Sequence, residues 1–281
     1  MPRSRPFAQV DVFTDTPLLG NPVAVVLDGE GVHTDAMRRF ATWTNLSEST
    51  FVSPPAHPDA DYALRIFTPE RELPFAGHPT LGSCHAWLRA GGRPKGTSIV
   101  QECGAGLIEI RYDDTSGELY FAAPPRQRSG PLDVDAVGAL AAGLGIDPAT
   151  VVDHQWCDNG PPWQALLLAS ADAVLDLQPD GAALPGAFVG VVGRHRPGTA
   201  ADFEVRAFFP AGQGMGEDPV TGSLNAAIGQ WLIGSGLAPD TYVVAQGTRL
   251  GRAGRVSVSL VDDHVWVGGR CVVVLDGSAI L

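Results

Sequence analysis

The chain has 281 residues, a formal net charge of −12 at pH 7, and a composition that is 44% hydrophobic and 18% charged. This length allows two domains of ordinary size, and the negative charge argues against nucleic acid and anionic membranes as partners. No run of about 18 apolar residues and no signal-peptide segment is present, so we expect a cytoplasmic protein without a membrane span.

The first half of the chain predicts many short strands and two helices. Helices are expected at 35–43 and 79–90, where apolar residues recur at helical spacing, and Gly91-Gly92 ends the second. Strands, bounded by turn residues, are expected at 8–13, 23–27, 49–52, 62–67, 99–103, 107–112 and 118–121.

A proline-containing polar segment, 122–131, is the best linker candidate. It predicts an N-terminal lobe at 1–124 and a C-terminal lobe at 125–281, with the final strand free to return to the first lobe. The expected elements after the linker are helices at 134–144 and 219–233 and strands at 164–169, 189–192, 205–209, 242–245, 255–260 and 265–274.

An internal repeat is visible between 78–83 (HPTLGS) and 218–223 (DPVTGS), where Pro, Gly and Ser match at a constant spacing of 140 residues. The alternative is a chance match, because these residue types are common in the chain. Since proline suits the first position of a helix, the repeat predicts His78 and Asp218 near the N-caps of two central helices. For Asp218, a simple capping role is the alternative to a functional one.

Two such helix starts would bind an anion, because they present free N–H groups and the positive end of the helix dipole. The nearby small residues Gly77, Gly82, Gly222 and Ser223 would let it approach the backbone closely. The phosphate-binding pattern G-x-x-x-x-G-K-[ST] is absent, so a carboxylate is the expected anion.

Glu48 is the one charged residue of the segment 45–52, which leads into a predicted strand. A solvated glutamate at a strand start is one interpretation. The other is a desolvated carboxyl group whose raised pKa suits proton transfer near neutral pH. The residue pattern alone leaves both open.

The four cysteines form no C-x-x-C motif, and no histidine pair stands at metal-ligand spacing. Buried, reduced thiols are therefore expected, with no metal site. Cofactor-binding motifs and a nucleophile arrangement of the G-x-S-x-G type are also absent, so we expect no cofactor and chemistry that depends on side chains alone.

Four blocks of the sequence together resemble the signatures of the PhzF (phenazine biosynthesis) family: 20–25 (GNPVAV), 45–51 (NLSESTF), 67–82 and 216–223 (GEDPVTGS). The resemblance extends over essentially the whole chain. It implies an α+β, diaminopimelate-epimerase-like fold, in which two similar lobes each wrap a β-sheet around a central helix and the active site lies between them. It also implies a homodimer.

By the same motif matching, the resemblance implies that Glu48, His78 and Asp218 are catalytic. The substrate contacts implied are Ser47, Gly77, Gly222 and Ser223. Related racemases use two facing cysteines at the helix starts, whereas here these neighbourhoods hold no cysteine. Cys84 would lie about one turn inside its helix, so two-cysteine racemisation is disfavoured.

The activity that the resemblance implies is cofactor-independent isomerisation of a small, cyclic, amino-acid-derived carboxylate. The family's founding reaction is that of trans-2,3-dihydro-3-hydroxyanthranilate in phenazine biosynthesis, and other members act on other antibiotic-pathway intermediates. Glu48 would move a proton and a double bond as general acid and base. Two alternatives are a racemase or epimerase that uses Glu48 with another base, and a small-ligand-binding protein without catalysis.

Overall fold

The computed structural model describes residues 2–211 and 214–281, which form two compact units. The first unit contains residues 2–122 and 268–281, and the second contains the described residues of 123–267. None of the helices described is long and apolar enough to cross a membrane.

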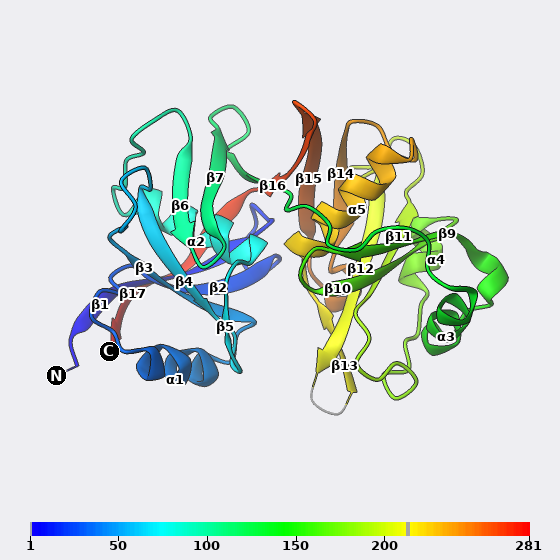
Figure 1. The fold of residues 1–281 in the computed structure, drawn as a ribbon, viewed down its shortest axis with the longest axis horizontal. Coiled ribbons are helices and arrows are strands. Elements are labelled where there is room, and N and C mark those ends of the chain that lie inside the picture. The colour runs from blue at the N-terminus through cyan, green and yellow to red at the C-terminus, as the bar shows by residue number, and fades with distance from the viewer. Residues whose placement is uncertain (1, 212–213) are drawn as a thin grey trace. The chain divides into compact units, whose positions relative to one another are not determined.

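The first unit is built from strands around one buried helix, with a second helix outside (Figure 1). Its elements are β1 (Ser4–Val12), β2 (Asn21–Val26), α1 (Thr34–Thr44), β3 (Glu48–Ser53), β4 (Tyr62–Phe67), β5 (Glu72–Leu73), α2 (Gly77–Arg89), β6 (Ile99–Cys103), β7 (Gly106–Asp113), β8 (Glu118–Ala122) and β17 (Cys271–Ile280).

The strands of the first unit are ordered β17-β1-β2-β3-β4-β6-β7-β8, with β5 added as a hairpin on β4. The pairs β2–β3 and β4–β6 are parallel and the others antiparallel. A parallel pair needs a long connection. Helix α1 lies in the connection from β2 to β3, and α2 lies in the connection from β4 to β6. Helix α2 packs against β1, β2 and β3.

The second unit repeats this plan. Its elements are α3 (Val134–Leu144), β9 (Val151–Asp158), β10 (Pro162–Leu168), α4 (Ala171–Leu175), β11 (Val189–Arg194), β12 (Phe203–Ala211), β13 (Gly214–Asp218), α5 (Gly222–Gly234), β14 (Thr241–Gln246), β15 (Gly254–Val261) and β16 (His264–Gly269), with single turns of 3-10 helix at Pro148–Thr150 and Thr248–Leu250.

The strand order β9-β10-β11-β12-β14-β15 matches β1-β2-β3-β4-β6-β7 pair by pair, including the two parallel pairs β10–β11 and β12–β14. The short strand β13 adds to β12 as β5 adds to β4. A polar detail also recurs. Asp61 and Asp202 each accept a hydrogen bond from a backbone N–H of the parallel neighbour strand, at Val100 and Val243 respectively, at 2.8 Å. The predicted duplication is thus present in the topology.

The alignment proposed for the duplicated helices is wrong, however. Helices α2 and α5 correspond at a spacing of 145 residues at both ends, from Gly77 to Gly222 and from Arg89 to Gly234. Each begins four residues after its preceding short strand ends. His78 therefore corresponds to Ser223, and Asp218 ends β13 instead of standing at the start of α5.

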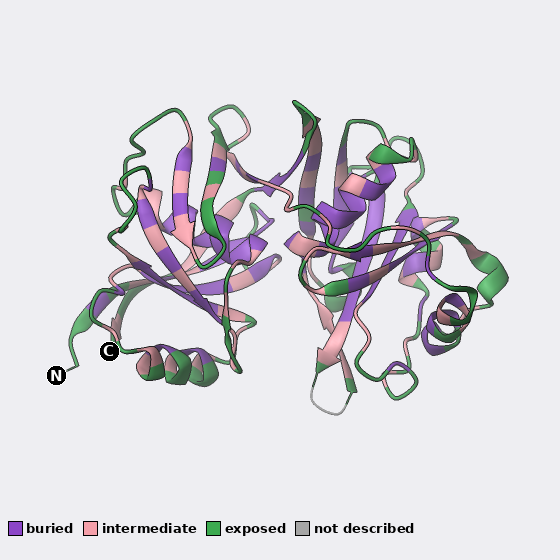
Figure 2. Ribbon diagram, viewed as in Figure 1, coloured by how far each residue is buried: buried purple, intermediate pink, exposed green. Residues whose placement is uncertain are grey.

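The central helices form the cores of the two units, and Figure 2 shows both largely buried. Glycine allows the close approach of α2, because a Cβ at Gly82 would lie 2.4 Å from a methyl carbon of Val23 in β2. Helix α1 instead covers the opposite face of the sheet with Met37 and Ala41, and ends at Asn45, whose left-handed backbone (φ 53°) terminates it. The α+β class with one central helix in each unit is confirmed.

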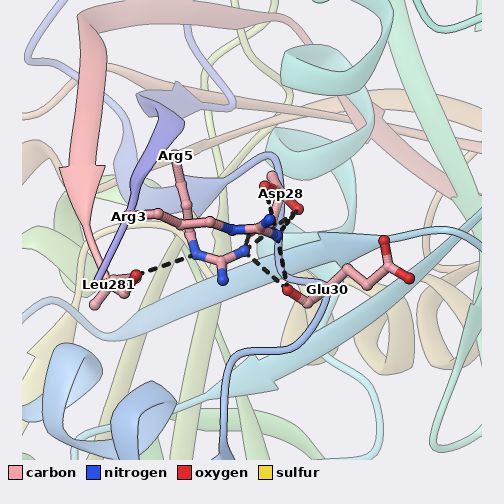
Figure 3. A network of polar contacts seen from close by, with 5 residues as sticks. All are labelled: Arg3, Arg5, Asp28, Glu30 and Leu281. Carbon is pink, nitrogen blue, oxygen red and sulfur yellow. Dashed lines mark hydrogen bonds and ion pairs between the residues drawn. The ribbon is translucent and has the colours of Figure 1, made fainter. Parts of the chain in front are cut away.

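The two ends of the chain meet in the first unit, where β17 pairs antiparallel with β1 (Figure 1). Figure 3 shows the polar contacts that fix them. Arg5, which is buried, donates to the carbonyl groups of Asp28, Glu30 and Leu281. Arg3 forms an ion pair with Asp28 at 3.1 Å.

Candidate functional site

Glu48 and Asn21 lie at the same edge of the first unit's sheet. Glu48 is the first residue of β3 and Asn21 the first of the parallel strand β2, where Val23 is the register partner of Glu48. Because these strands are parallel, their amino-terminal ends lie at the same end of the sheet. A hydrogen bond of 2.8 Å between the hydroxyls of Thr50 and Ser83 ties β3 to α2, so Glu48 is held near the start of that helix.

His78, the second residue of α2, meets Glu48 at this edge. Its Nε2 lies 3.3 Å from Oε2 of Glu48, and the side chains are 7% and 15% exposed respectively. The other ring nitrogen, Nδ1, lies 3.5 Å from the amide nitrogen Nδ2 of Asn21. Two of the three predicted catalytic residues are thus brought together, and the carboxylate of Glu48 keeps some access to solvent.

Burial decides the charge of this histidine. It lowers the pKa of His78 to about 3, against the smaller, opposing effect of a backbone hydrogen bond with Pro22. The ring is therefore neutral at pH 7. The neutral ring carries one proton: the amide nitrogen of Asn21 is a donor and favours Nδ1 as its acceptor, whereas the backbone carbonyl of Pro22 accepts from a ring N–H.

The starts of α2 and α5 lack a side-chain hydrogen bond from their N-cap residues, Ala76 and Thr221. Helices α1 and α3 also lack such a bond, but their N-caps are exposed, so water can replace it. Gly77 and Gly222, in contrast, are buried. Ser47, another predicted contact, is exposed immediately before β3.

Asp218 is held in the second unit by a network that the sequence did not reveal. Its Oδ2 accepts a hydrogen bond of 2.7 Å from the hydroxyl of Thr221, and its backbone carbonyl accepts one from Gln246. Gln246 is fully buried in β14 and also accepts from the backbone N–H of Thr221 at 3.0 Å. This clamp keeps residues 219–221 out of the helix, which explains why α5 begins later than predicted.

The neighbouring residue, Glu217, adds a second anchor. Arg206 of β12 forms a two-pronged contact with its carboxylate at 2.8 and 2.9 Å, and donates to the carbonyls of Val174 and Leu177. Arg206 is buried and Glu217 nearly so, with side chains 5% and 12% exposed. Such a paired, fully bonded guanidinium is rigid. The end of β13, and with it Asp218, is therefore fixed.

Ser223, in the first turn of α5, is also held in place by hydrogen bonds. Its Oγ accepts a hydrogen bond of 3.1 Å from the indole Nε1–H of Trp163, and its backbone carbonyl accepts one of 2.8 Å from Asn159.

Three residues of these networks were not predicted as site residues: Asn21, Trp163 and Gln246. Asn21 stood inside a recognised sequence block, but nothing in the sequence distinguishes Trp163 or Gln246 from ordinary strand residues. The expectation that the starts of α2 and α5 open on one cleft stays a prediction.

Two of the cysteines, Cys84 and Cys157, have thiols that are unsuited to acid–base or nucleophilic chemistry. Cys84 is buried in the packed face of α2, and burial raises the pKa of its thiol to about 12. Burial likewise raises the pKa of Cys157 to about 12. A buried thiol with a raised pKa is a poor base and nucleophile, which agrees with the expectation that a two-cysteine mechanism is disfavoured.

Comparisons with known proteins agree with this picture. The chain is 33% identical over 245 residues to a trans-2,3-dihydro-3-hydroxyanthranilate isomerase from Pseudomonas fluorescens, covering 86% of each chain. It is 36% identical to the protein named antisense-enhancing sequence 1 of Schizosaccharomyces pombe, covering 98% of each. The isomerase class expected from the sequence is thus that of a curated relative.

Solved structures give the fold. A PhzF-family protein from Bacillus anthracis matches with a TM-score of 0.84 at 22% identity, covering 99% of this chain and all of the other. A probable proline racemase from Agrobacterium radiobacter matches with a TM-score of 0.59 at 14% identity, covering 98% of this chain and 92% of the other. The predicted epimerase-like fold is therefore confirmed. The model of the phenazine biosynthesis-like protein family matches residues 10–277, and the chain belongs to this PhzC-PhzF family.

Proposed function

We propose that the protein is a cofactor-independent isomerase in which Glu48 moves a proton from one carbon to another of a small, cyclic, amino-acid-derived carboxylate. The observation that carries the proposal is the pairing of Glu48 with a neutral, buried His78 at 3.3 Å. A trans-2,3-dihydro-3-hydroxyanthranilate isomerase is among the relatives, which supports this substrate class.

In the proposed reaction, the carboxylate of Glu48 takes a proton from an allylic carbon, and the electron pair of that C–H bond enters the conjugated system. The resulting carboxylic acid then gives the proton to another carbon of the same system. Substrate and product have the same atoms and the same oxidation level. We place the ring proton of His78 on Nε2, 3.3 Å from Oε2 of Glu48, where it stabilises the carboxylate before the reaction.

The remaining predicted residues have binding roles in this proposal. The N–H group of Gly222 and the hydroxyl of Ser223 at the start of α5 bind the substrate carboxylate, because helix starts favour anions, and Gly77 at the start of α2 is proposed as a substrate contact. Asp218, whose carboxylate also accepts from Thr221, binds an amino or hydroxyl group of the substrate. Ser47 contacts the substrate from the segment that precedes Glu48.

The test is to incubate the purified protein with trans-2,3-dihydro-3-hydroxyanthranilate in D2O and to follow absorbance and deuterium content. An isomerase shifts the double bond and places deuterium, exchanged into the Glu48 carboxyl group, on the carbon that receives the proton. A racemase would place deuterium at a stereocentre without moving a double bond. A binding protein would leave the compound unchanged, and either of these results contradicts the proposal for this compound.

A further inference from the structure

Trp163 is a buried aromatic residue near the start of β10, and it holds the hydroxyl of Ser223. The indole is 3% exposed and packs edge-on against Phe188, with ring centroids 5.3 Å apart. Its Nε1–H donates to Oγ of Ser223 at 3.1 Å. The turn between β9 and β10 adds a second tether, because Asn159 donates to the backbone carbonyl of Ser223.

The chemistry of the indole fixes the role of the serine. An indole nitrogen only donates, whereas a hydroxyl both donates and accepts. Oγ of Ser223 must therefore be the acceptor of this bond, and its own proton is directed to some other acceptor. Without such a partner, a serine in the first turn of a helix tends to bond back to the local backbone.

We propose that Trp163 is a positioning residue that holds Ser223 in the orientation where its hydroxyl donates to the substrate carboxylate. The inference rests on the proposed function, in which Ser223 contacts that carboxylate. The N–H groups of Gly222 and Ser223 at the start of α5 are donors too, so the groups gathered here suit an acceptor-only ligand. A carboxylate is such a ligand, and an ammonium group is not.

The experiment measures anthranilate binding by calorimetry for the unchanged protein, Trp163→Phe, Ser223→Ala and the double variant. Trp163→Phe keeps the ring against Phe188 and removes only the donor. We expect it to weaken binding about two- to twelvefold, the usual value of one hydrogen bond. In the Ser223→Ala background the same change should have no effect, because Trp163 acts through Oγ of Ser223.

Two controls separate positioning from packing. Phe188→Leu loosens the contact with the indole but keeps its N–H, so it should affect binding equally with and without Ser223. Aniline, which lacks the carboxylate, should bind all four proteins of the cycle alike. Equal weakening by Trp163→Phe with and without Ser223, or no anthranilate binding by the unchanged protein, overturns the assignment.

A second measurement can be made on the unchanged protein. The indole N–H signal of Trp163 should shift when acetate is added to the isotope-labelled protein, and Ser223→Ala, where it folds, should show no such shift. Absence of a shift in the unchanged protein also overturns the assignment. If anthranilate binds as expected but trans-2,3-dihydro-3-hydroxyanthranilate is not converted, the proposed function fails while the role of Trp163 stands.

Discussion

The starts of α2 and α5 occupy the same place in two repeats of one topology but carry different chemistry. The first presents His78, neutral and 3.3 Å from the carboxylate of Glu48. The second presents Ser223, bound by an indole N–H, with Asp218 four residues before the helix. The scaffold is duplicated, whereas among the described residues a histidine in the first turn of the central helix pairs with a carboxylate at α2 and not at α5.

The two units place the carboxylate near the central helix on different strands. In the first unit, the carboxylate and the histidine belong to β3 and α2. In the second unit, residue Val189 begins the strand β11 that corresponds to β3, so no carboxylate stands at that place. Its carboxylate comes instead from the strand before the helix, at Asp218. The proposed acid–base group therefore belongs to the first helix start, and the proposed carboxylate contact to the second.

Glu48→Gln should have the largest effect on turnover of the substitutions that test this difference. The amide keeps the volume of the side chain but cannot accept and return a proton. General acid–base catalysis is worth about 10²–10⁴-fold, so kcat for trans-2,3-dihydro-3-hydroxyanthranilate should fall at least a hundredfold, with anthranilate affinity retained. A variant with more than about a tenth of the original kcat would show that Glu48 is not the proton carrier.

Asp218→Asn should give the opposite pattern at the second helix start. The amide still accepts from Thr221 through its oxygen but no longer carries charge toward a substrate amino group. A hydrogen bond to a charged group is worth about 1.5–3 kcal/mol, so KM should rise roughly ten- to a hundredfold while kcat changes less. Steady-state kinetics separate the two parameters. A fall in kcat alone would assign Asp218 to the chemical step.

The pH dependence of stability should sharpen the contrast further. The pKa of His78 is about 3 in the folded protein, below the ordinary value of 6.5, so the unfolded chain binds a proton more readily. The contribution of His78 to folding stability is therefore fully present above pH 6.5 and is lost as the pH drops from 6.5 toward 3. One proton contributes up to about 1.4 kcal/mol per pH unit.

His78→Gln removes that contribution, and urea unfolding at several pH values measures it. Between pH 6.5 and 5 the stability of this variant should fall less steeply than that of the unchanged protein. Identical slopes would mean that His78 titrates alike in both states, and the neutral buried ring would be wrong.

Cys84→Ala should have the smallest effect on activity. The thiol is buried, its pKa is raised to about 12, and it lies in the packed face of α2. We expect kcat and KM to stay within about threefold of their original values, well short of the loss expected for a catalytic acid or base. A loss as large as that of Glu48→Gln would bring back a cysteine mechanism.

Local patterns predicted most of the elements. The bounds of α3 and β4 were predicted as observed, because apolar periodicity and turn residues mark them clearly. The strand β9 was missed, since its polar and aromatic residues carry no regular alternation. The strand β13 and the short helix α4 were likewise not anticipated.

The site was predictable in part. The sequence blocks led to Glu48 and His78, and the structure places them in contact. The start of α5 was predicted wrongly, because proline at 219 suggested a first helical position. Gln246, from a strand 25 residues farther on, binds the N–H of Thr221 and delays the helix. A contact of that separation leaves no local signal, and the same is true of Trp163 with Ser223.

The tautomer of His78 tests the central claim most directly, because the proposed reaction needs a neutral ring that donates to the carboxylate of Glu48. The ¹⁵N NMR shifts of the ring can be assigned by comparison with His78→Gln. The account predicts a neutral ring with its proton on Nε2 throughout pH 5–8. A ring that titrates near pH 6.5, or that carries its proton on Nδ1, would contradict it.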